Sequence, residues 1–426
     1  MTHLAIFLLV AQSPLTLDAA ITQGFEYSRR LAELEARAQA ADFAVAGRRA
    51  AELPVASAQA GYMRTNHVEE FSVVAPGPPP TRQVVYPDIP DNYRTRLDLQ
   101  WPIYTGGRSD ALLRAAEAER TATGKDLETA RADLRLEITR AYWAVVTARE
   151  TEVVLKRSLD AVDAHVKDVR ARLSSGLIPP NDVSSAEAQA SHQRLLAVEA
   201  ANQRAVSEAD LQRLIGVDPG PMTLGDKRDA VSTSPDVTAL VARALKERPE
   251  RQALEQRAAS ADLRAAAANA GRLPQIGIGG GYDYARPNPR IFPRHDEWQT
   301  SWDASINLTW TLWDGGRRAA ETGEARANAA ALKTRVEDFD RQVTFEVRAR
   351  ALELQSSQQA VTTADDEIRA AAEAERAIGE RYRAGVATAT DVLDAQVARL
   401  QAELDRARAV ANVRLAEARL ERSIGQ

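Results

Sequence analysis

Residues 305–317 read SINLTWTLWDGGR, and residues 96–108 read RLDLQWPIYTGGR. In both stretches apolar and polar residues alternate, which predicts a strand with one apolar and one polar face. Both strands end near a tryptophan and then reach Gly-Gly-Arg, where a long segment without proline begins. The same junction between a strand and a long helix is therefore predicted twice.

The repetition extends over nearly the whole chain. A shift of 209 residues aligns the later parts of the two copies, and a shift of 220 aligns the earlier parts. The first copy is longer at Phe71 to Asn92, which we interpret as a surface loop because loops absorb insertions at little entropic cost. The predicted repeats are 14–216 and 236–426, joined by a linker at 217–235 rich in Pro, Gly, Asp and Ser.

Composition favours long packed helices over several compact cores. The 426 residues contain only 5% aromatics, while Ala, Glu, Arg and Leu are abundant. The net charge of −5 offers no basic face for nucleic acid. There is no cysteine, so disulfides and cysteine-ligated metals are excluded.

Motifs for catalysis are weak. The glycines of 277–281 would need a further glycine at Tyr282 to form the dinucleotide-binding pattern, and a strand explains them better. The five histidines show no ligand spacing, and no G-x-S-x-G is present. We therefore expect no enzyme activity, no cofactor and no metal site.

The first residues have the character of a secretory leader. The apolar run Leu4 to Ala11 is too short to span a bilayer as a helix, and residues 1–13 fit a signal peptide. The preceding Met-Thr-His lacks the usual Lys or Arg. The start codon is then too late, the leader is atypical, or this run is the buried start of a helix.

Four strands are predicted, at about 54–66, 93–104, 274–285 and 299–313. Their length of about 11 residues suits a tilted strand that crosses a membrane. Aromatic residues gather toward both strand ends, as in the two interfacial girdles of a membrane protein. One set is Trp101, Tyr104, Trp310 and Trp313, and the other is Tyr62, Tyr93, Tyr282, Tyr284 and Trp302. A half-buried sheet in a soluble protein would show the same alternation.

Long helices make up most of the remaining sequence. One helix is predicted at 17–52, and helical hairpins are predicted at about 106–216 and 315–425. Apolar residues recur at alternating steps of four and three, which predicts coiled-coil seams. The seams are Leu155, Leu159, Val162, Val166, Val169 and Leu173, and Leu393, Val397, Leu400, Leu404, Ala407 and Ala411.

Each hairpin has a turn signal. We predict Gly176 and Gly385 as C-caps of the outgoing helices, with Asn181 and Thr388 as N-caps of the returning ones.

Four strands are too few to close a transmembrane barrel, because the smallest known barrels need about eight. An open strand edge cannot lie in lipid with its backbone groups unpaired. Copies of the chain must then share their strands, and two, three or four subunits would each give a permitted number.

These features together resemble the outer membrane efflux protein (TolC) family. The resemblance rests on the duplicated order, on the two Gly-Gly-Arg junctions, and on Arg381-Tyr382-Arg383-Ala384-Gly385 followed by Asp391-Val392-Leu393-Asp394-Ala395. It implies an α + β membrane protein that is mainly α. It also implies a homotrimer whose twelve-stranded barrel in the outer membrane continues as an α-helical tunnel in the periplasm.

The same resemblance implies an exit duct for a tripartite efflux pump or a type I secretion system. The duct would work with a periplasmic adaptor and an inner-membrane transporter. The alternative is a soluble or periplasmic coiled-coil scaffold or adaptor, although neither would need two girdled strand pairs.

Matching positions place the family's periplasmic gate at Tyr382, Asp391 and Asp394. Six carboxylates of a trimer would attract cations and raise some of the aspartate pKa values by repulsion. The alternative for Asp391 is a simple cap at a helix start. Ala387 replaces a basic residue that many members have, which places closed-state tethering in doubt.

The first hairpin supplies a secondary tip. Its residues are Gly176, Asn181 and Asp182, with Gly385 as the equivalent glycine in the second hairpin. Ser185 stands where the second copy has Asp394, so only the second hairpin carries two aspartates.

Overall fold

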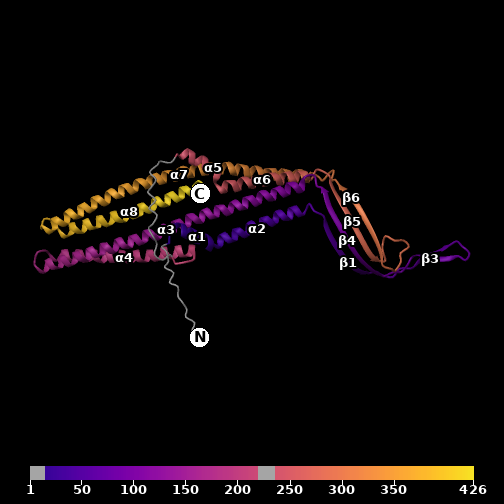
Figure 1. Ribbon diagram of the computed structural model, residues 1–426, viewed down its shortest axis with the longest axis horizontal. Helices are drawn as coiled ribbons and strands as arrows, with labels where there is room; N and C mark the ends of the chain where they lie inside the picture. The colour runs from indigo at the N-terminus through magenta and orange to yellow at the C-terminus, as the bar shows by residue number, and fades with distance from the viewer. Residues whose placement is uncertain (1–14, 219–235) are drawn as a thin grey trace, which may run out of the picture. The chain divides into compact units, whose positions relative to one another are not determined.

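The computed structural model describes residues 15–218 and 236–426, and it shows the predicted order twice (Figure 1). The first copy comprises α1 (Leu17–Tyr27), α2 (Arg29–Ala50), β1 (Val55–Arg64), β2 (Phe71–Ala75), β3 (Thr81–Tyr86), β4 (Asp91–Tyr104), α3 (Arg108–Ser174) and α4 (Pro180–Ile215). The second comprises α5 (Val237–Glu247), α6 (Pro249–Ala270), β5 (Gln275–Arg286), β6 (Gln299–Thr309), α7 (Arg317–Arg383) and α8 (Ala389–Ser423). The expected leader and residues 219–235 of the expected linker lie outside the described part.

The chain divides into two compact units. One contains the helical hairpins and consists of residues up to Ala36 together with Gly124–Ala253 and Val336–Gln426. The other contains the strands and consists of Arg37–Thr123 and Leu254–Arg335. Each unit draws on both sequence repeats, so a repeat is not by itself a compact unit.

The region ahead of each first strand contains two helices, so the prediction of a single helix was wrong. The last hydrogen bond of α1 runs from the N–H of Ser28 to the carbonyl of Gly24. The last hydrogen bond of α5 runs from the N–H of Arg248 to the carbonyl of Ala244, and both bonds are 3.0 Å long. Pro249 then begins α6. Proline cannot continue a preceding helix but is well suited to start one. The first copy shows the same break without a proline.

The long strands form one antiparallel sheet in the order β1-β4-β5-β6. Figure 1 shows them side by side, with the two copies joined at β4 and β5. Register places the apolar residues on one face, among them Ala58, Leu97, Leu99, Ile278, Tyr282, Ile306 and Leu308. The other face carries Gln59, Arg94, Arg96, Asp98, Asp283, Ser301, Asp303 and Ser305. The predicted alternation is therefore present across the sheet.

Two strand predictions need correction. The predicted loop at Phe71 to Asn92 contains the separate hairpin β2-β3, whose residues FSVVA and TRQVVY favour strands. Because its apolar residues occur in adjacent pairs, the search for strict alternation missed it. β6 ends at Thr309, so Trp310 and Trp313 follow the strand and do not belong to it.

The helical hairpins are held by apolar seams. In the first copy, Leu31, Ile138, Val145, Leu211 and Ile215 are buried in one core between α1, α2, α3 and α4. Further along, the predicted seams of α3 and α8 meet. The first contact groups Val162, Val166, Ala186, Ala190 and Leu393, and the second groups Val154, Leu155, Ala200 and Leu400. Alanines of α4 allow this close approach.

Over residues 15–218 and 236–426, no helix is both long enough and apolar enough to span a membrane.

Candidate functional site

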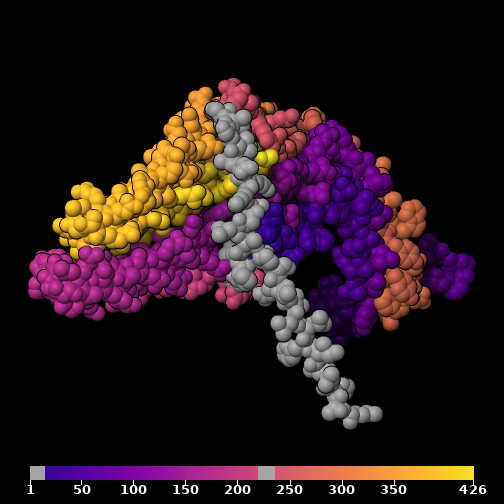
Figure 2. All heavy atoms as spheres, turned by 60° about the vertical axis from the view of Figure 1, so that its left-hand side comes forward, coloured from indigo at the N-terminus to yellow at the C-terminus, as the bar shows by residue number. Residues whose placement is uncertain are grey.

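The predicted gate residues lie where the ends of the two helical hairpins pack together. Figure 2 shows the magenta end of the first hairpin against the orange and yellow end of the second. Val169 of α3, Tyr382 of α7, and Ala389 and Val392 of α8 form a buried cluster there. The tips are thus held by side chains from both sequence repeats.

Tyr382 is the polar member of this cluster. Only 7% of the residue is exposed, and the Arg172 guanidinium carbon lies 4.3 Å from its ring centroid. Burial raises the pKa of Tyr382, and the nearby Asp168 carboxylate raises it further against the opposing charge of Arg172. The hydroxyl therefore stays protonated at neutral pH.

His165 also packs against this tyrosine, with ring centroids 5.7 Å apart. It is buried, and burial lowers its pKa, although the negative charge of Asp168 opposes this shift. His165, Asp168 and Arg172 were not among the residues predicted for this site. For His165 the sequence did contain a signal, because it adjoins the apolar seam of α3 at Val166.

Asp391 forms a capping box at the start of α8. Its Oδ2 accepts from the N–H of Thr388 at 2.7 Å, and its own N–H donates to the Thr388 hydroxyl oxygen at 3.1 Å. The first of these bonds is the main reason that the pKa of Asp391 is lowered. The predicted N-cap at Thr388 is confirmed, and Asp391 has the capping role that was the alternative to a gate.

Asp394 lies one turn further along α8 and is exposed. It has no part in the capping box. Positions three apart are neighbours on a helix surface, so the two carboxylates occupy one side of α8. A role for this pair in gating stays a prediction.

The secondary tip has a different cap. α4 begins at Pro180 with Pro179 as its N-cap, so the prediction of Asn181 as N-cap was wrong. Proline at the first helical position fixes a suitable φ and has no N–H to satisfy. The Asn181 amide instead donates to Asp182 Oδ1 at 3.1 Å.

Glycines end the outgoing helices at both tips. Gly176 and Gly385 adopt φ values of 70° and 78°, which favour glycine. The next residue in each case donates back to the carbonyl five positions earlier, as in a Schellman motif. The predicted C-caps are confirmed.

The tryptophans of the first girdle connect strand ends to helix ends. Trp101 Nε1 donates to the carbonyl of Glu52 at 3.1 Å, and Trp310 Nε1 donates to the carbonyl of Arg272 at 3.0 Å. Each indole thus satisfies a carbonyl near the end of the helix that precedes the first strand of its own copy. Tyr104 and Trp313 lie close by in sequence and are exposed.

A second row of aromatics lies at the opposite strand ends. Tyr62 and Tyr93 have centroids 5.0 Å apart, and Tyr93 lies 5.9 Å from Trp298. Trp298 stacks on Tyr284 at 4.7 Å. Trp298 was not predicted to belong to this row, because it lies just outside the alternating pattern. Two aromatic rows at the ends of an apolar face are typical of a sheet that meets lipid.

In the described part of the chain the sheet has two free edges, because β1 and β6 each pair with one strand only. Its apolar face is also open, since Leu97, Ile306 and Leu308 are exposed. Both features call for partners from outside a single chain.

Comparison with known proteins identifies the family. The sequence model of the Outer membrane efflux protein family matches residues 21–217 and 240–426. The chain therefore belongs to the outer membrane efflux protein family, and its location is the outer membrane. The alternatives of a soluble scaffold and an adaptor are thereby removed.

Individual relatives are distant. The chain is 27% identical over 269 residues to Outer membrane protein TolC of Vibrio cholerae, an alignment covering 62% of this chain and 60% of TolC. It is 26% identical over 235 residues to Protein CyaE of Bordetella pertussis, covering 54% and 49% respectively. The chain thus spans about half to three fifths of the length of these relatives.

The fold is that of known outer membrane channels. The crystal structure of the outer membrane protein VceC from Vibrio cholerae superposes with a TM-score of 0.80 at 19% identity, over 96% of both chains. The mainly helical fold with a small number of long strands is confirmed by this likeness.

Proposed function

We propose that the chain is the outer-membrane exit duct of a tripartite efflux pump or a type I secretion system. The observation that carries this proposal is the four-stranded sheet with an exposed apolar face and two edges that no other described strand pairs with. In lipid these edges need strands, so β6 of one copy would pair with β1 of the next. Three copies would close a barrel of twelve strands, and their hairpins would form the tunnel.

The duct would carry small molecules, metal ions or proteins across the periplasm and the outer membrane. A periplasmic adaptor and an inner-membrane transporter would deliver them, which the family membership supports. The proposal assigns the chain no catalytic activity.

Cysteine cross-linking tests the shared barrel, because the chain contains no cysteine of its own. We place one cysteine on β1, as Ala58→Cys, and a second on β6 at Ala304, Ile306 or Leu308 in turn. All four positions lie on the apolar face. Oxidation of membranes should produce covalent trimers for the β6 position that matches the register.

The matched control is Ala58→Cys alone, because equivalent strands of a closed trimer would be separated by three others. This variant should stay monomeric on denaturing gels. The proposed assembly would be contradicted if every cysteine pair gave covalent dimers and none gave trimers. Recovery of the protein outside the membrane fraction would also contradict it.

We also propose that Asp391 and Asp394 restrict the tunnel entrance to favour cations. Asp394→Ala removes a carboxylate without disturbing the capping box, whereas Thr388→Ala disturbs the box and keeps both carboxylates. Asp394→Ala, and the double variant that adds Asp391→Ala, should raise the conductance of the channel in planar bilayers or increase antibiotic leakage in cells. An increase from Thr388→Ala alone would instead indicate that helix capping controls the opening.

A further inference from the structure

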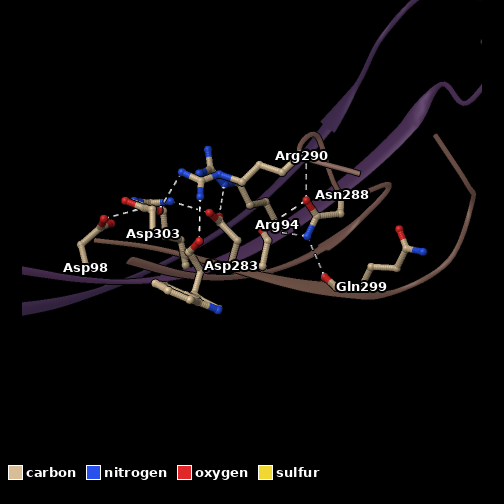
Figure 3. A network of polar contacts seen from close by, with 10 residues as sticks. Arg94, Asp98, Asp283, Asn288, Arg290, Gln299 and Asp303 are labelled. Carbon is tan, nitrogen blue, oxygen red and sulfur yellow. Dashed lines mark hydrogen bonds and ion pairs between the residues drawn. The ribbon is translucent and has the colours of Figure 1, made fainter. Parts of the chain in front are cut away.

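The polar face of the sheet carries a linked set of charges that no part of the proposed function uses. Figure 3 shows Arg94, Asp98, Asp283, Arg290 and Asp303 of this set. If the apolar face meets lipid, this polar face lines the interior of the barrel. The inference below therefore rests on the proposed function.

Arg96 holds the three carboxylates together. Its Nε donates to Asp98 at 2.7 Å, Nη1 donates to Asp283, and Nη2 lies 3.1 Å from Asp303. To reach Asp303 on β6, its guanidinium passes directly over Gly281 of β5, where any side chain would collide with it. Within the glycine-rich stretch 277–281, the space needed by the Arg96 guanidinium therefore explains the glycine at 281.

The side chains of Asp98 and Asp303 are 20% and 26% exposed, and two of the arginines of the set are more exposed than any of its aspartates. The Asp283 side chain is 2% exposed, but Arg94, which bonds it through Nε at 2.6 Å, is 52% exposed. Among the described residues, the Arg94 side chain makes no other polar contact, so its two terminal nitrogens have no partner there. A guanidinium fixed at one nitrogen with its outer donors free is well suited to bind a carboxylate or a phosphate.

The second exposed arginine, Arg290, comes from the segment between β5 and β6 and is held by both of its terminal nitrogens. Arg290 Nη2 lies 2.9 Å from Asp303, Nη1 donates to the carbonyl of Trp302 at 2.9 Å, and the side chain is 44% exposed. Asn288, almost fully buried, anchors this segment: its amide nitrogen donates to the Gln299 carbonyl at 3.0 Å. Its Oδ1 accepts from the Arg290 N–H at 3.0 Å (Figure 3). This segment is therefore folded onto the polar face.

We propose that Arg94 and Arg290 form an anion-binding belt on the channel wall, where carboxylate or phosphate groups of the exported molecule dock briefly. The formal charges of the set cancel, since three arginines match three aspartates. The exposed part is nevertheless mainly cationic, because the aspartate side chains are 2–26% exposed and those of Arg94 and Arg290 are 52% and 44% exposed. Three subunits would present six such guanidiniums.

The test measures the current through single trimers in phosphatidylcholine bilayers, which contain no anionic lipid, at low ionic strength to limit screening. Citrate is the probe. Wild-type channels should lose current as citrate is added. Arg94→Gln and Arg290→Gln should each raise the half-blocking concentration about threefold or more, as expected for an exposed charged contact. Arg94→Lys, which keeps the charge but loses the fork of donors, should fall between the wild type and Arg94→Gln.

Arg64→Gln is the matched control. Arg64 is also exposed and paired with an aspartate, Asp91 at 3.4 Å, but it lies on the opposite face of the sheet. It should leave the citrate response unchanged. Arg94→Gln should not unfold the sheet, because Asp283 keeps Arg96 as a partner.

The outcomes separate the two proposals. Channels that conduct but ignore citrate, or a response that Arg64→Gln weakens as much as Arg94→Gln, would overturn the belt and leave the duct intact. Failure of the wild-type protein to form any channel would overturn the duct, and the belt with it.

Discussion

Arg422, in the last turn of α8, connects three helices and provides a sharp test of how the helical unit is stabilised. Its Nε and Nη2 donate to Asp133 Oδ1 of α3 at 2.8 and 2.7 Å, and Nη2 also donates to Glu250 of α6. The Arg422 side chain is 11% exposed. We predict that Arg422→Met, which keeps most of the aliphatic volume, destabilises the protein.

The magnitude follows from what the substitution leaves behind. Breaking a fully buried ion pair costs about 3–5 kcal/mol, because the remaining charge is stranded. Here the Asp133 side chain is 41% exposed, and Glu250 keeps Arg248 at 3.4 Å. Arg422 Nη1 is also buried without a hydrogen-bond partner within the described residues, which reduces the net value of the contact. We therefore expect a loss of about 2 kcal/mol in the free energy of unfolding.

The duplication supplies a matched control in Arg213, which lies 209 residues earlier. Arg213 also pairs with two carboxylates, Asp210 at 3.0 Å and Glu137 at 3.2 Å, but its side chain is 60% exposed. Exposed pairs contribute little, so Arg213→Met should cost less than about 1 kcal/mol. Denaturant titration in detergent, at one protein concentration and with unchanged slopes, measures both losses.

Acid dependence provides a second readout. Burial alone would raise the pKa of Glu250, but the hydrogen bond and charge of Arg422, assisted by Arg248, lower it overall. Stability from Glu250 is therefore present above its unfolded pKa of about 4.3 and is lost as pH falls through the folded pKa. Arg422→Met should reduce that acid-dependent loss. Equal costs for the two arginine variants, or an unchanged acid profile, would refute the reasoning.

Three further predictions concern other sites. Gly281→Ala should lower the midpoint of thermal unfolding because it displaces Arg96, whereas Gly61→Ala, which has open space around it on the same face, should not lower it. Thr388→Ala should destabilise the helical unit by about 1 kcal/mol through loss of a helix cap, measured by denaturant titration. Because the pKa of His165 is lowered by burial, wild-type stability should fall as pH drops below about 6.5 and level off below the folded pKa, while His165→Phe should show no such step.

The sequence was sufficient for features with a regular period or a repeat. Alternation located the four long strands, and the turn glycines located both hairpin ends. The break between α1 and α2 was also readable, because Pro249 lies 220 residues from Arg29 and the copies align there. We missed it because the first copy has no proline to draw attention to the position.

The charged set on the sheet could not be predicted in the same way. Arg96 and Asp283 are 187 residues apart, and they meet only because β4 pairs with β5 in one register. A shift of one residue would turn Asp283 to the opposite face. Single-sequence patterns fix which face a residue takes but not which residue lies beside it on the neighbouring strand.

The two copies show which features the architecture requires and which it leaves open. In both copies a tryptophan indole N–H donates to a carbonyl near the end of a helix. In both copies the helical hairpin turns at a glycine in the left-handed conformation. These features join a strand to a helix or one helix to the next, so every repeat needs them. The ionic contacts differ: Arg422 is buried where Arg213 is exposed, and Asp394 faces solvent where the first copy has Ser185. If selectivity is decided at positions where the two copies differ, such as Arg422 and Asp394, substitutions at these positions should change transport or stability. The glycine turns of both hairpins and the tryptophan contacts between strands and helices should still form.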